Sequence, residues 1–166
     1  MEQVKFFENS HFYKDAEKTF LKHKKLIKEH LLEADVQHVG STAVPNSLTK
    51  GDLDIQVRVR PEQFTMAVKT LSLLYEVNEG SVNTHSFRAY KDDSTVPPLG
   101  VQLTVINSEF DFFWKFRDVL LISDKYRKEY DDLKRNFEGK EMEEYREAKN
   151  EFFVKIIETP EFKNLG

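Results

Sequence analysis

The sequence predicts an α/β or α+β protein, in which a β-sheet is flanked by helices and followed by a C-terminal helical cover. Strand-like and helix-like patterns alternate over residues 12–106, whereas only helical patterns follow from residue 109 to residue 158. This order of elements is typical of a sheet that packs against helices in layers. Because 166 residues is close to the usual length of one domain, we expect a single domain over residues 1–166.

The first half of the chain begins with a helix and continues with strands. Apolar residues recur at helical spacing from about Phe12 to Leu32, which predicts an amphipathic helix. A short strand is expected at Val36–Val39, and a longer one at Leu53–Val59, where apolar and polar side chains alternate. Pro61 then fits the first turn of a second helix, whose apolar face runs to Tyr75.

The second half supplies two more strands and three helices. Alternating side chains predict strands at Ser86–Lys91 and Val101–Ile106. Gly139 fits the break between the last two of three helical stretches. These stretches are Glu109–Leu121, Ser123–Phe137 and Glu141–Glu158.

The composition narrows the classes of protein that the chain can represent. It contains no cysteine, which excludes disulfide frameworks, thiolate metal sites and cysteine nucleophiles. Its net charge of -4 gives no strong attraction to nucleic acid or to an anionic membrane. No apolar run is long enough to span a bilayer, and the N-terminal segment lacks the apolar stretch of a signal peptide. We therefore expect a cytoplasmic protein with no membrane partner.

Two aspartates carry the central prediction. Asp52 and Asp54 stand at the start of the second predicted strand, separated by a single leucine. The side-chain period of a strand places both carboxylates on one face, where they can reach one cation, or two cations about 4 Å apart. Carboxylate oxygens suit Mg²⁺, so both residues are predicted metal ligands and catalytic residues. A solvated strand face is the alternative explanation.

The Gly-Ser pair that follows the first strand is the predicted phosphate site. Gly40 lets backbone N–H groups approach an anion, the hydroxyls of Ser41 and Thr42 can bond phosphate oxygens, and a helix opened by Pro45 would add its dipole. The ammonium of Lys50 can neutralise phosphate just before the aspartates. An ordinary helix cap and a solvated loop lysine are the competing explanations.

The spacing of these motifs resembles the nucleotidyltransferase superfamily, in which a Gly-Ser pair precedes Asp-x-Asp on a hydrophobic strand. The run HVGSTAVP at residues 38–45 is similar to the signature of the GrpB family, the UPF0157 group. The segments 116–120 and 145–153 also resemble helices of that family. The resemblance covers about residues 36–157 and implies a nucleotidyltransferase-like mixed β-sheet flanked by helices, with C-terminal helices. Members of the family occur fused to dephospho-CoA kinase.

One strand departs from the superfamily's pattern. Nucleotidyltransferases usually place a third carboxylate on a neighbouring strand, where it helps to deprotonate the acceptor hydroxyl and to hold a second metal. On the matching strand of this chain the cleft-facing residues are Gln102 and Thr104. Their neutral oxygens can contact a metal but are poor general bases. This departure counts against two-metal catalysis and leaves single-metal nucleotide binding.

Five further residues are candidates for the walls of the site. His38 points toward the aspartates if the two strands pair, Arg88 offers a cation beside a tyrosine that can stack on a base, and Arg117 can bind phosphate bidentately. Tyr145 and Lys149 share one helical face and can close the cleft. Each also has a structural explanation: a backbone-bonded histidine, an exposed strand face, an ion pair with an acid, or ordinary surface chemistry.

Two further patterns concern macromolecular partners. A lysine stripe on the first predicted helix could bind nucleic-acid phosphates without sequence preference, but nearby acids dilute it, which favours a solvated face. The stripe consists of Lys14, Lys18, Lys22 and Lys25, and the acids are Asp15, Glu17 and Glu29. Residues 110–116 carry five aromatic side chains, too many for one buried stripe. Packing of some of them against a second copy of the chain, and therefore a homodimer, is a further hypothesis.

Three classes of function follow from these residues. The first is Mg²⁺-dependent transfer of a nucleotidyl group from a nucleoside triphosphate to an unknown acceptor. The second is a protein that binds a small-molecule nucleotide or a CoA-like ligand without chemistry, because the third carboxylate is missing. The third is an interaction protein whose aromatic helix is the working surface.

Overall fold

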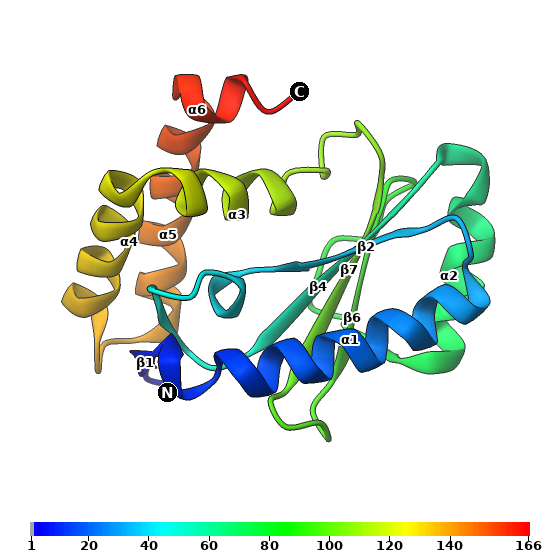
Figure 1. Cartoon of the computed structure of the whole chain (residues 1–166), viewed down its shortest axis with the longest axis horizontal. Coiled ribbons are helices and arrows are strands. Elements are labelled where there is room, and N and C mark those ends of the chain that lie inside the picture. Colours follow the sequence, from blue (N-terminus) through cyan, green and yellow to red (C-terminus); the bar gives the residue numbers. More distant parts are fainter. Residues whose placement is uncertain (1) are drawn as a thin grey trace.

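A five-stranded mixed β-sheet forms the centre of the molecule (Figure 1). The structure is a computed structural model that describes residues 2–166. The strand order is β2 (Asp35–Val39), β4 (Leu53–Val59), β7 (Leu99–Val105), β6 (Phe87–Asp92) and β5 (Glu76–Val77). β4 and β7 are parallel, and all other neighbouring strands of this sheet are antiparallel. The predicted mixed sheet flanked by helices is therefore confirmed.

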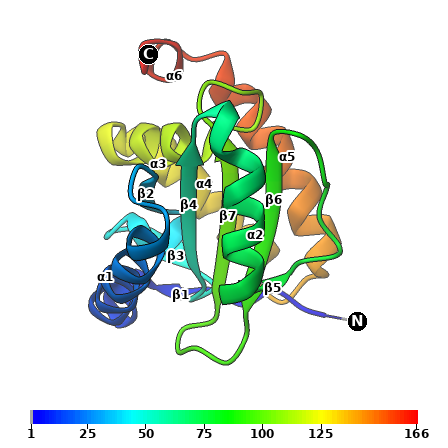
Figure 2. The same ribbon diagram turned by 90° about the vertical axis from the view of Figure 1, so that its right-hand side faces the viewer.

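Two helices, α1 (Tyr13–His30) and α2 (Phe64–Leu74), cover one face of this sheet (Figure 2). The main core lies between them and the central strands, and Phe20, Ile27 and Leu71 from the helices belong to it. The apolar residues of β4 all point into this core, as the alternation in the sequence predicts. The polar side chains of β4 are consequently directed to the opposite face.

Helix α3 (Phe113–Ile122) covers only part of that opposite face. The backbone N–H of Trp114 donates to Gln56 Oε1 at 3.0 Å. Asp111, in the turn before α3, accepts a hydrogen bond from Gln56 Nε2 at 2.9 Å and two from Arg58 at 2.7 Å. These bonds cover the second half of β4 and leave Asp54 at the end that α3 does not reach.

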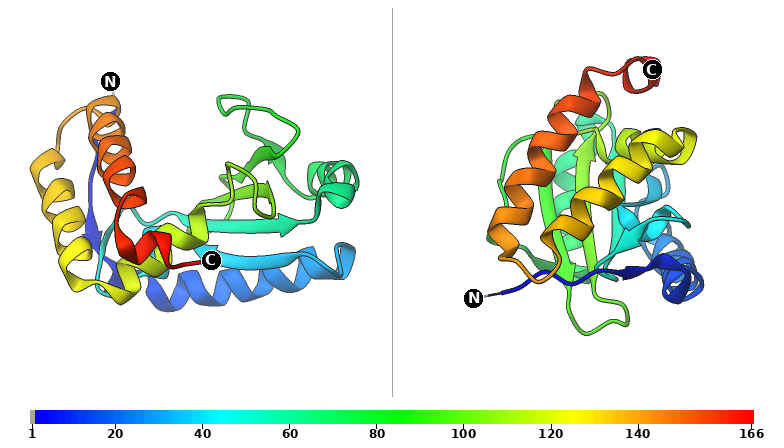
Figure 3. Two further views of the ribbon diagram at one scale, coloured as in Figure 1. Left: turned by 90° about the horizontal axis from the view of Figure 1, so that it is seen from above. Right: turned by 90° about the vertical axis from the view of Figure 1, so that its left-hand side faces the viewer.

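The C-terminal helices α4 (Asp124–Phe137), α5 (Met142–Ile157) and α6 (Pro160–Lys163) complete the fold. Figure 3 shows α4 and α5 across from the end of the sheet at which β4 begins. Asp131 of α4 accepts hydrogen bonds from Ser47 Oγ at 2.8 Å and from the backbone N–H of Leu48 at 2.9 Å. These bonds tie α4 to the loop that leads into β4.

The N-terminal segment also contacts these helices, at the turn between α4 and α5. The N–H of Val4 donates to the carbonyl of Lys140 at 3.0 Å, and the N–H of Gly139 donates to the carbonyl of Val4 at 2.8 Å. Strand β1 (Phe7–Glu8) then pairs with β3 (Leu48–Thr49). The turn between α4 and α5 is thus held by a backbone ladder, which fixes both helices relative to the sheet.

The predicted elements are present with shifted ends, but one prediction is wrong. Pro45 does not open a helix, because the short 3₁₀ turn η2 (Ser41–Ala43) comes before it and Gly40 is the residue that caps this turn. Helix α3 begins at Phe113 rather than at Glu109, since Asp111 turns into the sheet instead of the helix surface. The short elements β1, β3, β5 and α6 and the 3₁₀ turns η1 (Asn9–His11) and η3 (Pro61–Gln63) carried no sequence pattern long enough to predict.

No helix within residues 2–166 combines the length and the apolar character that a membrane crossing requires.

Candidate functional site

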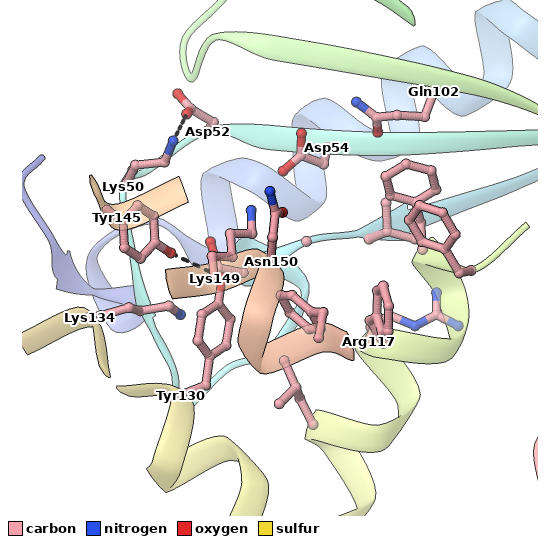
Figure 4. A pocket seen from close by; sticks show the side chains of 18 of the residues that line it. Lys50, Asp52, Asp54, Gln102, Arg117, Tyr130, Lys134, Tyr145, Lys149 and Asn150 are labelled. Carbon is pink, nitrogen blue, oxygen red and sulfur yellow. Dashed lines mark hydrogen bonds and ion pairs between the residues drawn. The ribbon is translucent and has the colours of Figure 1, made fainter. Parts of the chain in front are cut away.

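A cavity of about 620 Å³ lies between the uncovered end of the sheet and helices α3, α4 and α5. This volume falls in the range of small-molecule sites, which is about 300–1,000 Å³. Figure 4 shows acidic side chains on its sheet wall and basic, amide and tyrosine side chains on its helical wall. Its polar lining residues are Ser41, Lys50, Asp52, Asp54, Gln102, Arg117, Tyr130, Lys134, Tyr145, Lys149 and Asn150.

Asp52 and Asp54 both line this cavity, as the strand period predicts. Asp54 is bracketed by Gly40, which directly follows β2, and by Gly100 in β7. A Cβ atom on Gly40 would lie 2.4 Å from Asp54 Oδ2, and a Cβ atom on Gly100 would lie 3.2 Å from Asp54 Oδ1. Gly40 also has a φ of +76°, a conformation that L side chains rarely adopt. Glycine is therefore required at Gly40 for the carboxylate to occupy its position.

The charges of the cavity are held at a cost in free energy. Burial raises the pKa of Asp54 to about 6, an effect that the ammonium of Lys149 opposes and the carboxylate of Asp52 reinforces. Burial also raises the pKa of Asp52, against the effect of Lys50, whose Nζ lies 3.9 Å from Asp52 Oδ2. Burial lowers the pKa of Lys149, which Asp54 opposes. Shifted groups of both signs around one cavity are typical of functional sites.

The raised pKa of Asp54 predicts a pH-dependent stability in the absence of metal. Because the folded carboxyl has a pKa of about 6 against an ordinary 3.8, its stabilising contribution is complete below pH 3.8 and is lost as the pH rises through 6. Between pH 5 and pH 8 the free energy of unfolding of the wild type should fall by about 1 kcal/mol relative to Asp54→Asn. Urea unfolding of both proteins with a chelator present measures this difference. An equal pH response in both proteins would contradict it.

The Gly-Ser turn reaches the cavity, but its hydroxyls are already engaged. Ser41 lines the cavity, and its Oγ shares a hydrogen bond of 2.7 Å with Thr49 Oγ1. Thr42 is fully buried, and its hydroxyl donates to the carbonyl of Asp52 at 3.0 Å. Thr42 is therefore not available to a phosphate, contrary to the prediction. The short η2 turn also lacks the helix dipole on which part of that prediction depended.

His38 does not line the cavity, which corrects the prediction for this residue. Its Nε2 lies 2.9 Å from Thr42 Oγ1, and its Nδ1 lies 2.6 Å from Glu17 Oε1 on α1. The side chain points to the opposite face of β2 from Val39, which does line the cavity. Strand alternation explains the difference, because consecutive residues of β2 point to opposite faces of the sheet. His38 thus supports the η2 turn from behind.

Two other predicted residues lie outside the cavity. The guanidinium carbon of Arg88 is 5.7 Å from the ring centroid of Phe64 in α2, so Arg88 is on the covered face of the sheet. Thr104 is fully buried beneath α3 and accepts a hydrogen bond from Gln56 at 2.9 Å. Arg117 does line the cavity, yet it donates to Asp118 at 2.9 Å and to the carbonyl of His38 at 3.0 Å.

The helical wall contains polar residues that the sequence analysis missed. Tyr130 and Lys134 of α4 join the predicted Tyr145 and Lys149 of α5. The two tyrosine hydroxyls lie 3.0 Å apart. Burial lowers the pKa of Lys134 to about 7, which Asp131 opposes. A signal existed: the spacing Tyr-x-x-x-Lys occurs once in each of these consecutive helices, so both pairs present one face.

The remaining wall of the cavity is aromatic. Phe113, Phe112, Phe116 and Phe153, in this spatial order, form a continuous series, which we call the aromatic wall. Successive ring centroids are 4.5, 5.2 and 4.3 Å apart. Phe110 instead stacks on Phe87. These contacts within one chain account for most of the aromatic density near α3, and a homodimer stays a prediction.

The donor atoms of the sheet wall fit one magnesium ion. Asp52 and Asp54 offer carboxylate oxygens, and Gln102 Oε1 is buried with no hydrogen-bond partner within residues 2–166. Mg²⁺ prefers such hard oxygen donors and usually keeps water or phosphate oxygens in its other positions. In the part of the chain that the structure describes, no three acidic or histidine side chains gather closely enough to hold a metal. An all-protein metal cage is therefore not formed there.

Comparison with protein families and known sequences gives a consistent result. The family model described as "GrpB protein" matches residues 11–159. A UPF0157 protein of Vibrio cholerae is 29% identical over 157 residues, which cover 94% of this chain and 83% of the relative.

Solved structures provide the comparison of folds. The crystal structure of conserved protein GrpB from Enterococcus faecalis matches with a TM-score of 0.63 and 21% identity, over 89% of this chain and 93% of that one. A cytoplasmic RNA terminal U-transferase matches with a TM-score of 0.49 and 12% identity, over 73% of this chain and 36% of that one. The first match shows a shared fold. The second is too distant to support an argument.

Proposed function

The chain belongs to the GrpB family, and from this premise we propose that its cavity binds a nucleoside triphosphate with Mg²⁺ and transfers the nucleotidyl group to an acceptor. One observation carries the proposal: Asp52 and Asp54 face a cavity whose lining also includes the cationic side chains of Lys50, Arg117, Lys134 and Lys149. Carboxylates that can hold a cation, close to basic groups that can bind phosphate, are the elements of a phosphoryl-transfer site.

Each wall has a defined task in this proposal. Asp52 and Asp54 hold the metal, with the unpaired oxygen of Gln102 beside them. When bound, Mg²⁺ supplies charge neutralisation and polarises phosphate oxygens. The backbone at Gly40 and the ammonium of Lys50 orient the phosphates. The aromatic wall takes the base, because aromatic rings stack on any base without needing a particular hydrogen-bond pattern.

A second candidate function is the binding of a nucleotide or a CoA-like ligand without chemistry. The observation that favours it is the missing third acid: Gln102 occupies the cleft-facing position on β7, and its amide makes a poor general base. Both candidates need the same cavity, and they differ only in whether a bond to phosphorus is broken.

Two measurements test the proposal. First, ATP, CTP, GTP and UTP are screened for an increase in melting temperature with and without Mg²⁺, since a ligand that binds the native state raises it. We expect a shift that depends on Mg²⁺ for at least one nucleotide; the absence of any shift contradicts the transferase and the nucleotide-binding form of the second candidate. Second, pyrophosphate release is measured with that nucleotide and a small-molecule extract as the source of acceptor. Release supports the transferase, and binding without release supports the second candidate.

A further inference from the structure

Lys149 differs from the other cations of the cavity. The ammonium of Lys50 lies beside Asp52, Lys134 donates to Ser47 Oγ at 3.0 Å, and Arg117 pairs with Asp118. Lys149 alone among these four side chains has no hydrogen bond or ion pair within residues 2–166. A partly buried cation without a partner is costly, which indicates that an anion completes its surroundings.

The position of Lys149 is fixed by its helix. Tyr145, one turn earlier on α5, is buried and its hydroxyl lies 3.0 Å from that of Tyr130. Figure 4 shows the side chains of Lys149 and Asn150 extending from α5 toward Asp54 on the opposite wall. A ligand anion held at Asp54 through a metal would therefore meet this ammonium.

The charge balance of the sheet wall limits the number of metals. Two carboxylates neutralise one divalent cation. A second divalent cation, as in two-metal sites, would find phosphate oxygens on the nucleotide but would also need a further protein carboxylate on this wall. Gln102, on the neighbouring strand β7, lies next to Asp54 and carries a neutral amide in place of a carboxylate. The sheet wall therefore supplies protein ligands for one cation, and Lys149 on the helical wall offers a second positive charge to the same cavity.

We propose that the site uses one divalent cation, and that the ammonium of Lys149 takes the place of a second one at the phosphoryl group that is transferred. This inference rests on the proposed function. In the reaction, the acceptor oxygen forms a bond to the α-phosphorus, the bond from that phosphorus to pyrophosphate breaks, and the acceptor proton passes to solvent. Lys149 stays protonated throughout and stabilises the negative charge that develops on the phosphoryl oxygens.

The number of bound metal ions tests the proposal without any need for turnover. Mn²⁺, whose free concentration is measured by electron paramagnetic resonance, replaces Mg²⁺, and a non-hydrolysable analogue of the preferred nucleotide is present. We expect one Mn²⁺ per chain in the wild type. Two Mn²⁺ per chain in the wild type would overturn the proposal. No metal-dependent binding of any nucleotide would instead refute the proposed function itself.

Variants of Lys149 test separately whether its ammonium contributes to binding of the metal–nucleotide complex. Lys149→Met should weaken binding of the Mn²⁺–analogue complex roughly 30-fold or more, whereas Lys149→Arg, which keeps the charge, should weaken it much less. The matched control is Lys155→Met, which removes an exposed lysine from the same helix. Ligand-free Lys149→Met should be at least as stable as the wild type, because an unpaired charge is removed. Equal affinities for Lys149→Met and Lys155→Met would overturn the proposal.

A charge exchange gives the sharpest outcome. In the double variant Lys149→Met/Gln102→Asp a carboxylate is added beside Asp54 and the ammonium is removed. If Lys149 replaces a metal ion, this variant should bind two Mn²⁺ per chain in the presence of the analogue. A folded double variant that binds only one would contradict the exchange.

Discussion

Asp54→Asn is expected to abolish Mg²⁺-dependent nucleotide binding and, at the same time, to make the ligand-free protein more stable above pH 7. The substitution keeps the shape of the side chain and removes its charge. Burial raises the pKa of Asp54 to about 6, so holding this carboxylate ionised at neutral pH costs free energy that a neutral amide does not. In the proposed site the same carboxylate is a ligand of the metal. We expect affinity for the metal–nucleotide complex to fall about 100-fold or more, since changes to groups that merely support a metal ligand already cost about 10–100-fold.

Opposite changes in stability and binding separate this result from simple unfolding. Calorimetric titration with Mg²⁺ and nucleotide measures the affinity, and urea unfolding measures the stability. Asp132→Asn is the control, because Asp132 is an exposed aspartate on α4 that, within residues 2–166, pairs only with Arg135. It should change neither quantity appreciably. Binding that survives in Asp54→Asn would remove Asp54 from the metal site.

Gly40→Ala should be the most destabilising small substitution in the site, lowering the free energy of unfolding by about 3–5 kcal/mol. Two causes act together. The φ of +76° is unfavourable for alanine, and the new methyl group would lie 2.4 Å from Asp54 Oδ2. Because that contact is with the strand that carries both aspartates, any protein that still folds must displace Asp54. Urea unfolding and Mg²⁺-dependent nucleotide binding should therefore both be impaired.

Gly139→Ala is a matched control that measures the cost of the positive φ alone. Gly139 has a φ of +79°, yet a Cβ atom there would meet no heavy atom within 4 Å. Its substitution should cost only about 1–2 kcal/mol and leave nucleotide binding intact. Gly40→Ala should also be less harmful in an Asp54→Ala background, where the carboxylate oxygen that clashes is absent. If Gly40→Ala and Gly139→Ala lowered the free energy of unfolding equally, the contact with Asp54 would be unimportant.

Local patterns predicted the secondary structure well where the segments were long. The strict alternation over residues 53–59 gave both the extent of β4 and the face of each side chain. The helical periodicity over residues 12–32 gave α1. Short segments were missed, since β1, β3 and β5 have two residues each and owe their pairing to distant partners. Sequence patterns carry no record of such pairing.

The misplaced site residues share one origin. Placing His38, Arg88 and Thr104 in the cavity required knowing which face of each strand the helices cover. Arg88 and Thr104 are both polar residues on central strands, but α2 covers the first and α3 the second. Lys134 was missed for the opposite reason: its burial against Ser47 and Tyr130 depends on how α4 is tied to the loop before β4.

The sequence by itself determined the Gly-Ser turn, the two aspartates on one strand face and the order of helices and strands, because these depend on spacing within short segments. Only the tertiary structure decided which of the candidates meet. The cavity forms between residues about a hundred positions apart, Asp52 and Asp54 on one wall and Tyr145 and Lys149 on the other. The backbone hydrogen bonds of Val4 and those accepted by Asp131 set the spacing between the two walls. Contacts between such distant segments leave no local periodicity in the chain.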